Sequence, residues 1–272
     1  MSRIEITNTD DERIAIFLGL RDHVARQVRE RPGGDRAGSF IAEGDLVIER
    51  ALAAGHRLDA VVIDGARTKP LPEVIDETTP VYAASTEVLT VITGRPELRD
   101  PLACFVRPEL PRIADVLAKA RVVALLEGVN NPNNLGVIMR NAAGLGIDAV
   151  LLDPTSGDPL YRRAIRASMG QVFTLPHTPV PALPEALAEL RSEGFTSIAL
   201  SPAADCTLAE LTWPDRAVIL LGAEGPGLSE AALAAADVSG RISMARGVDS
   251  LNVGSAAAIA FHHAATMRKT SP

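Results

Sequence analysis

The chain has 272 residues, of which 47% are hydrophobic and only 3% aromatic, so its length favours two domains with aliphatic cores. Its formal net charge of −7 excludes nucleic-acid binding through a general positive field, so any nucleic-acid contact must come from local basic patches. The polar, acidic start is unlike a secretion signal and no apolar run could cross a bilayer, which predicts a cytoplasmic protein without membrane contact.

The first part of the chain alternates expected strands and helices. Apolar spacing predicts a helix over residues 11–28, which the sequence PGG at 32–34 ends. Strands are expected at residues 40–42, 59–63, 81–83 and 103–106, with helices at 44–54 and 85–93. This alternation predicts a small α/β domain over residues 1–108.

Residues 109–272 form the second expected domain, which begins with a proline-bearing linker and a short helix near 114–120. Apolar strands are predicted at 122–126, 149–152, 197–200 and 217–221, and helices at 135–145, 160–168 and 183–193. Continuous apolar strands that alternate with helices are typical of a parallel sheet covered on both faces. The alanine-rich segment at 251–267 predicts a long closing helix with Ser250 as its N-terminal cap.

The cysteines and histidines predict neither a disulfide nor a metal site. Cys104 and Cys206 lie in different expected elements, so reduced thiols are the simpler interpretation. The five histidines show no metal-ligand spacing, and no metal is expected.

A first polar motif, NNPNNLG at residues 130–136, directly follows an expected strand and opens a helix. Ligand sites of α/β proteins form at such carboxyl ends of parallel strands. Arg140 lies less than two helical turns beyond Asn134, so both side chains can face one cleft. The alternative is that Asn133 or Asn134 caps the helix and Pro132 shapes the turn.

A second motif, the glycine-rich bend GAEGPGLS at residues 222–229, also follows an expected strand. Glycine permits backbone angles and close approaches that other residues forbid, so main-chain amides here can reach a ligand. A dinucleotide-binding loop is the rival interpretation, but the order of Gly222, Gly225 and Gly227 differs from the G-x-G-x-x-G fingerprint. Taken alone, Glu224 would more simply cap the turn that follows.

The third motif, SLNV at residues 250–253, leads into the alanine-rich closing helix. Capping of this helix by Ser250 is the plain structural interpretation. The small residues that follow Asn252 allow close packing, either in the interior or between subunits.

Together these three motifs resemble those of the SpoU (TrmH-type) RNA ribose methyltransferases of the SPOUT superfamily. The likeness spans residues 122–261, and RASMG at 166–170 adds a fourth, weaker match. Ala223 stands where the family often has Asn or Ser, and Ser243 stands where it usually has proline. Residues 1–108 fit, less specifically, the small α/β substrate-binding domain that often precedes this fold.

The resemblance implies an α/β protein with a parallel-sheet SPOUT domain whose C-terminal segment forms a trefoil knot. It implies a homodimer that binds S-adenosyl-L-methionine and methylates a ribose 2′-hydroxyl of RNA, with no metal and no membrane involved. Carried over position by position, the residues that line the reacting side are Asn134, Arg140, Glu224, Ser250 and Asn252. Those that hold the cofactor, largely through backbone and apolar contacts, are Gly222, Ile242 and Leu251.

Arg140 is the residue that accounts of this family often make the base for the 2′-hydroxyl. Because arginine stays protonated in proteins, our hypothesis is that Arg140 does not act as the base. Instead, it binds the phosphate next to the target ribose and stabilises the alkoxide that develops on the 2′-oxygen. The proton then passes to water or to a phosphate oxygen. By analogy with ribosome-directed members, which carry a separate N-terminal domain, ribosomal RNA is favoured over transfer RNA.

Two other classes of protein compete with this function. A non-catalytic RNA- or ribosome-binding protein with a degenerate methyltransferase fold would explain Ala223 and Ser243. A nucleotide-dependent oxidoreductase fits less well, because the glycine order is wrong and no acidic residue stands in a suitable strand.

Overall fold

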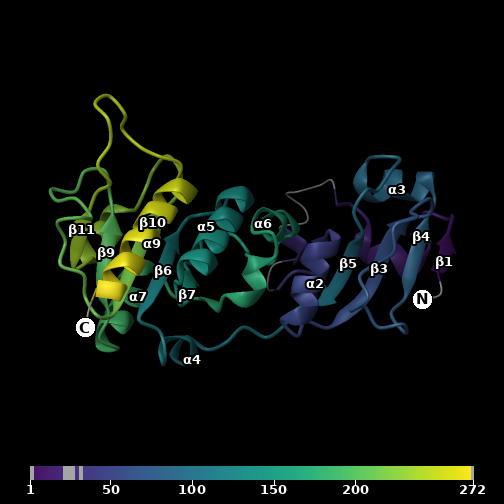
Figure 1. Cartoon of the computed structure of the whole chain (residues 1–272), viewed down its shortest axis with the longest axis horizontal. Coiled ribbons are helices and arrows are strands. Elements are labelled where there is room, and N and C mark those ends of the chain that lie inside the picture. Colours follow the sequence, from purple (N-terminus) through teal and green to yellow (C-terminus); the bar gives the residue numbers. More distant parts are fainter. Residues whose placement is uncertain (1–2, 21–27, 31–32, 271–272) are drawn as a thin grey trace. The chain divides into compact units, whose positions relative to one another are not determined.

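The chain folds into two compact units (Figure 1). The structure is a computed structural model that describes residues 3–20, 28–30 and 33–270. The first unit comprises Met1–Glu109 together with Leu160–Phe173. The second comprises Leu110–Pro159 together with Thr174–Pro272.

A five-stranded mixed sheet forms the first unit. Its strand order is β1 (Arg3–Ile6), β4 (Val81–Ala84), β3 (Leu58–Asp64), β5 (Leu102–Val106) and β2 (Ser39–Glu43). β1, β4 and β3 run parallel, whereas β5 is antiparallel to both of its neighbours. Helix α2 (Asp45–Ala53) follows β2, and α3 (Thr86–Thr93) follows β4. The α/β arrangement expected here is confirmed, and β1 is an additional strand that its polar sequence did not reveal.

The single helix expected over residues 11–28 is wrong in the part that the structure describes. Glu12–Phe17 forms a short 3-10 helix, η1, which buries two apolar side chains. The backbone then becomes extended at Leu18 (φ −68°, ψ 148°) and ends the helix. Apolar spacing could not show this break, because side chains three residues apart share a face in both kinds of helix. Residues 21–27 lie outside the described residues.

A segment from the second half of the sequence completes the first unit. Leu160–Phe173 contains α6 (Arg162–Ala167), which packs against β2 at the edge of the sheet. The carboxylate of Glu43 in β2 accepts hydrogen bonds from Arg162 (2.5 Å) and Arg166 (2.8 Å). Covering an edge strand removes a row of exposed backbone groups that would otherwise pair with another chain. The expectation that residues 1–108 and 109–272 fold as two separate domains stays a prediction.

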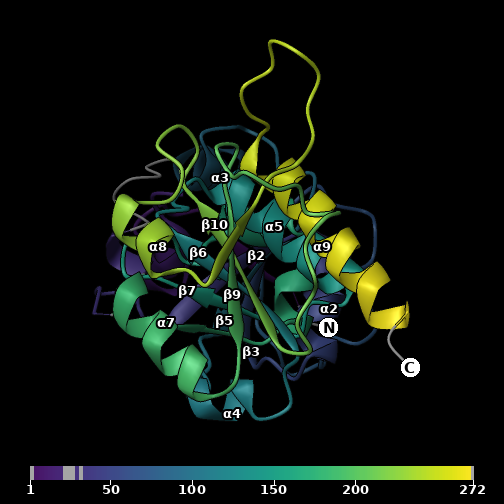
Figure 2. The same ribbon diagram turned by 90° about the vertical axis from the view of Figure 1, so that its left-hand side faces the viewer.

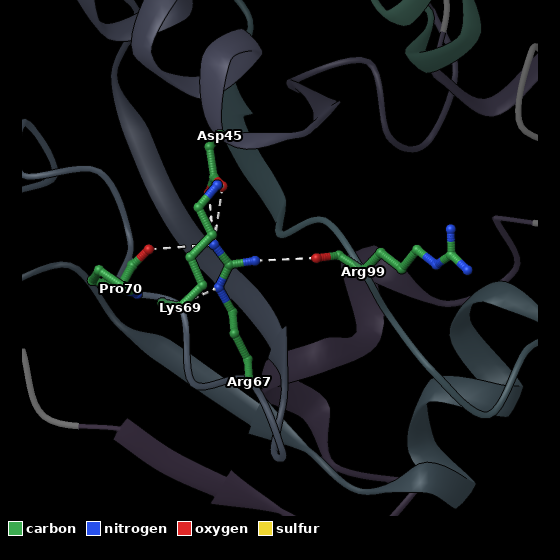
Figure 3. Close-up of polar contacts among 5 residues, drawn as sticks. All are labelled: Asp45, Arg67, Lys69, Pro70 and Arg99. Carbon is green, nitrogen blue, oxygen red and sulfur yellow. Dashed lines mark hydrogen bonds and ion pairs between the residues drawn. The ribbon is translucent and has the colours of Figure 1, made fainter.

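Arg67 ties two loops of the first unit to the start of α2 (Figure 3). Its side chain is only 5% exposed, and one guanidinium nitrogen bonds both carboxylate oxygens of Asp45, at 2.9 and 3.0 Å. The guanidinium also donates to the carbonyl oxygens of Lys69, Pro70 and Arg99. Burial works to raise the pKa of the Asp45 carboxyl, but the hydrogen bonds from Lys69 and Arg67 outweigh it and hold the pKa below its usual value. The network therefore stabilises the fold of the first unit.

The second unit is built on a six-stranded sheet (Figures 1 and 2). Its strand order is β11 (Val238–Gly240), β9 (Thr196–Leu200), β10 (Ala217–Gly222), β6 (Val122–Glu127), β7 (Ala149–Leu152) and β8 (His177–Pro179). Every neighbouring pair is parallel, so the predicted parallel sheet is confirmed. The two edge strands, β8 and β11, are too short and polar to stand out in the sequence.

Helices cover both faces of this parallel sheet. On one face α4 (Ile113–Leu117), α7 (Leu183–Ser192) and α8 (Glu230–Ala235) share an apolar core with the strands. α5 (Pro132–Leu145) and α9 (Val253–Thr270) pack against each other on the side away from α7 and α8 (Figure 2). The predicted layers are therefore confirmed.

The register of the two central strands places the first two motifs next to each other. Gly222 at the end of β10 pairs with Glu127 at the end of β6. Because parallel strands point the same way, the segments that follow leave the sheet at one edge, where ligands of α/β folds bind.

Cys104 and Cys206 are not joined in a disulfide. Cys104 is buried in β5, and Cys206 donates a hydrogen bond to the carbonyl oxygen of Ser239 at 3.2 Å. Among the residues that the structure describes, no three His, Cys, Asp or Glu side chains gather closely enough to hold a metal ion. In the same part of the chain, no helix is both long and apolar enough to span a membrane.

Candidate active site

The first motif begins α5 with Asn131 as its N-cap. The Asn131 side chain accepts hydrogen bonds from the backbone N–H groups of Asn133 (2.9 Å) and Asn134 (3.4 Å). Pro132 occupies the first helical turn, where its fixed φ and missing N–H are tolerated. Capping by Asn133 or Asn134 is therefore wrong. The side chain of Asn134, which is only 8% exposed, is left for another partner.

The second motif folds back onto the end of β10. A Cβ atom on Gly222 would lie 2.1 Å from the backbone carbon of Gly227, so only glycine fits there. Gly225 and Gly227 have φ values of 94° and 73°, in the left-handed region that favours glycine. The N–H of Gly227 donates to the carbonyl oxygen of Ala223 at 2.9 Å and closes the bend. Glu224 lies within this bend, and its side chain is exposed.

The third motif begins α9 with Asn252, not Ser250, as its cap. The Oδ1 of Asn252 accepts hydrogen bonds from the N–H groups of Gly254 (2.9 Å) and Ser255 (3.4 Å). The helix starts at Val253, two residues later than expected, and Ser250 is exposed before it. The predicted Ser250 cap is wrong because composition indicates a helix but does not locate its first turn.

Side chains from all three motifs meet in one hydrogen-bonded network. The Nδ2 of Asn134 donates to Glu224 Oε2 at 2.8 Å. The Nδ2 of Asn252 donates to Asn134 Oδ1 at 2.9 Å and to Glu224 Oε1 at 3.4 Å. Asn134 is 90 residues from Glu224 and 118 from Asn252, so only the folded sheet brings them together. The alternative in which Glu224 merely caps the next turn is wrong, since its carboxylate faces two amides.

Hydrogen bonds set the orientation of each polar side chain in the network. Two amide groups donate to the one carboxylate of Glu224, at 2.8 and 3.4 Å. Asn252 uses its oxygen to cap α9 and its nitrogen to reach the other two residues. Glu224 and Asn252 are exposed, whereas Asn134 is buried beneath them. Such an arrangement can hold the polar groups of a substrate in a defined orientation.

Asp153 holds the turn that follows β6, next to the glycine-rich bend, and sequence reasoning missed it. Its buried carboxylate accepts hydrogen bonds from the N–H of Gly128 (3.0 Å) and the hydroxyls of Thr155 (2.5 Å) and Ser156 (2.7 Å). A Cβ atom on Gly128 would lie 3.3 Å from the Cβ of Ala223, so the bend packs closely on this turn. The available signal was an acidic residue directly after an apolar strand, at the edge where sites form.

The other expected site residues take no part in this hydrogen-bonded network. Within the described residues, no hydrogen bond or ion pair joins it to the five remaining positions, namely Arg140, Gly222, Ile242, Ser250 and Leu251. Arg140 is exposed on α5. Ile242 is half-buried after β11, and Leu251 is 40% exposed. The connection between β11 and α9 that carries these last two residues projects as a long loop (Figures 1 and 2).

Comparison with known proteins agrees with this geometry. A model of the SpoU rRNA Methylase family matches residues 121–262, the region that contains all three motifs. An uncharacterised tRNA/rRNA methyltransferase of Mycobacterium tuberculosis is 41% identical over 266 residues, which cover 95% of this chain and 90% of that protein. The 23S rRNA (guanosine(2553)-2′-O)-methyltransferase of Bacillus subtilis is 28% identical over 231 residues, 84% of this chain and 89% of that enzyme.

A solved structure has the same fold over nearly the whole chain. It is the SpoU methyltransferase AviRb from Streptomyces viridochromogenes, crystallised in complex with the cofactor AdoMet. The TM-score is 0.79 at 22% sequence identity, and the match covers 96% of this chain and 100% of that one. The resemblance read from the motifs is thus confirmed, and this chain belongs to the SpoU rRNA Methylase family.

Proposed function

We propose that this protein is an S-adenosylmethionine-dependent methyltransferase that modifies a ribose 2′-hydroxyl of RNA. The observation that carries the proposal is the network of Asn134, Glu224 and Asn252, in which the three motifs of the family meet. A chain that had lost its chemistry would have no need to keep three distant polar side chains aligned at hydrogen-bond distance.

Three further residues fit the cofactor expected from the family. Gly222 ends the central strand β10 and allows the bend to fold back on it, a close approach that any side chain would block. Ile242 and Leu251 offer apolar side chains on the loop that precedes α9. Backbone groups and aliphatic side chains suit the adenosine and methionine parts of S-adenosylmethionine, so we assign these three residues to its binding.

The chain's own residues supply positioning and electrostatic stabilisation. When bound, S-adenosylmethionine offers a methyl group on a positively charged sulfur, which the 2′-oxygen attacks as the carbon–sulfur bond breaks. Well-aligned reacting groups can contribute about 7–11 kcal/mol to lowering such a barrier. Arg140 binds the phosphate next to the target ribose and stabilises the negative charge that develops on the 2′-oxygen. The proton leaves to water or to a phosphate oxygen, because arginine stays protonated.

Arg140 is suited to this role by its exposure. Its side chain makes no hydrogen bond or ion pair with any other residue that the structure describes. A planar guanidinium can therefore bind a phosphate with two parallel hydrogen bonds, without first breaking a contact within the described residues. Ser250 is exposed as well, and we assign it to the substrate side of the same site.

Ribosomal RNA is the substrate we propose. The Bacillus subtilis relative, whose name specifies a 23S rRNA ribose, matches 84% of this chain and so extends well beyond the region of the family model. The first unit would then recognise RNA through local contacts, since the chain as a whole is acidic. The trefoil knot, the homodimer and the cytoplasmic location expected from the resemblance belong to this proposal.

The test is to map ribose methylation in ribosomal and transfer RNA from cells with and without the protein. We expect one ribose of ribosomal RNA to lose its methyl group when the protein is absent and to regain it when purified protein and S-adenosylmethionine are added to the extracted RNA. Unchanged methylation at every site would count against the proposal.

The second candidate is a non-catalytic RNA- or ribosome-binding protein, favoured by Ala223 and Ser243. Ala223 has no polar atom to offer beyond its backbone, and it packs beside Gly128. Calorimetric titration with S-adenosylmethionine separates the two functions, because a degenerate site would release no heat. Measurable binding of the cofactor supports the enzyme.

A further inference from the structure

One face of α5 contacts the start of α9 at three successive points. Asn134, Val137 and Asn141 are spaced three and four residues apart, so they lie on the same side of the helix. Figures 1 and 2 show α5 and α9 side by side. Asn134 belongs to the network, whereas Val137 and Asn141 have no part in the proposed chemistry.

The contact farthest from the network is a hydrogen bond from Asn141. Its Nδ2 donates to the carbonyl oxygen of Gly254 at 2.8 Å, in a partly buried setting. Gly254 lies in the first turn of α9, only two residues after Asn252. The same residue is held from the other side, since its N–H donates to Asn252 Oδ1 at 2.9 Å. Gly254 is therefore hydrogen-bonded to Asn141 through its carbonyl oxygen and to Asn252 through its N–H.

The middle contact is a close approach that requires glycine. A Cβ atom on Gly254 would lie 2.7 Å from Cγ1 of Val137 and 3.1 Å from Oδ1 of Asn252. Val137 is β-branched and stiff in a helix, so it cannot turn away without cost. The two helices thus meet at van der Waals distance where the cap forms, and their register is set by shape as well as by hydrogen bonds.

We propose that Asn141 is a positioning residue for the methyl-transfer site, acting through Gly254 and Asn252. This inference rests on the proposed function. With the Asn141 bond in place, the first turn of α9 cannot slide along α5, and Asn252 Nδ2 stays 2.9 Å from Asn134 Oδ1. Without it, the first turn of α9 is free to shift, and the 3.4 Å bond from Asn252 to Glu224, already long, is the first to break.

The direct test replaces Asn141 by leucine, which has a similar shape but no donor. For the Asn141→Leu variant we expect kcat for methyl transfer to unmodified ribosomal RNA transcripts to fall at least ten-fold. The KM values for RNA and S-adenosylmethionine should change less than two-fold. Amide hydrogen exchange at Gly254 and Ser255, the two N–H groups bound by Asn252, should become several-fold faster.

A double-mutant cycle separates positioning from plain stability. If Asn141 acts through Asn252, adding Asn141→Leu to an Asn252→Ser variant should lower kcat little further. The matched control is Thr266→Val, which also removes a hydrogen bond to a carbonyl oxygen on α9, that of His262 at 2.9 Å. That control should leave both kcat and the exchange rates unchanged.

A steric variant tests the same junction independently. Gly254→Ala should lower kcat and speed the exchange of the Ser255 amide, and Val137→Ala in the same chain should recover part of both. Unchanged exchange in Asn141→Leu, or losses of kcat that add in the cycle, would overturn the inference. The exchange measurement needs neither RNA nor cofactor. A wild-type chain that transfers no methyl group would therefore count against the proposed function, but not against the hold of Asn141 on the first turn of α9.

Discussion

Asn252 shows how one side chain can serve structure and site at once. Its oxygen caps α9, which typically stabilises a helix by about 1 kcal/mol. Its nitrogen donates to Asn134 and Glu224. A capping serine has a shorter side chain and could not make the same two contacts. Sequence reasoning identified Asn252 as a site residue but gave the cap to Ser250, because Ser, Asp, Thr and Asn are all good caps and only geometry distinguishes them.

Replacing Asn252 by aspartate tests these two roles separately. In the Asn252→Asp variant one carboxylate oxygen would still cap α9, but the other would face Asn134 Oδ1 and Glu224 Oε1, where a donor is needed. We expect methyl transfer to fall at least a hundred-fold, with a change in melting temperature of only a few degrees. Steady-state methylation assays and thermal unfolding measure the two effects.

A compensating variant provides the control for that substitution. Glu224→Gln combined with Asn252→Asp exchanges donor and acceptor, so an amide again faces a carboxylate across the 3.4 Å gap. The double variant should be more active than Asn252→Asp alone. If it is no better, repulsion between the two carboxylates is not what inactivates the single variant.

Whole elements are held in place by polar residues at the opposite edge of the sheet from the site. Asp237, between α8 and β11, accepts hydrogen bonds from the N–H and hydroxyl of Ser197 in β9, at 2.8 and 2.6 Å. Its other carboxylate oxygen accepts one from Arg191 of α7, at 2.8 Å. Burial works to raise the pKa of the Asp237 carboxyl, but these hydrogen bonds outweigh it and the pKa lies below its usual value.

The lowered pKa of Asp237 predicts a pH-dependent stability. Since the folded form holds this carboxylate ionised more tightly than the unfolded chain does, its contribution is complete above the unfolded pKa of about 3.9. The contribution is lost as the pH falls through the lower, folded pKa. Asp237→Asn should lower the free energy of unfolding at neutral pH by about 1–3 kcal/mol and flatten its decline in acid.

Urea unfolding at a series of pH values measures this effect. Asp215→Asn is the matched control, because the Asp215 side chain is 89% exposed and its 3.5 Å ion pair with Arg121 contributes little. Identical acid profiles for wild type and Asp237→Asn would contradict the assignment.

At the scale of the whole molecule, the chain passes between its two units three times. The crossings follow Glu109, Pro159 and Phe173. Phe173 lies 5.5 Å from Phe40 and 5.0 Å from His56 in ring-centroid distance, so the inserted segment adds an aromatic side chain to the first unit. A cut at residue 108, the expected domain boundary, would leave this segment behind.

A fragment of residues 1–109 should therefore be less stable than the same residues in the intact chain. It would lose α6, the ion pairs of Glu43 and the Phe173 contacts, and it would expose the edge of β2. We expect a lower melting temperature and a tendency to associate. Circular dichroism and light scattering of the fragment against the full chain measure both, and a fragment as stable as the intact unit would refute the structural role of the segment.

By itself, the sequence determined the alternation of strands and helices, the parallel sheet of the second unit and the residue types of the three motifs. These features depend on local periodicity and on side-chain chemistry, which neighbouring residues carry. Only the tertiary structure decided that Asn134, Glu224 and Asn252 touch, which asparagines cap α5 and α9, and that residues 160–173 pack with the first unit. Those outcomes depend on strand register and helix packing between residues about a hundred positions apart, which no local pattern encodes.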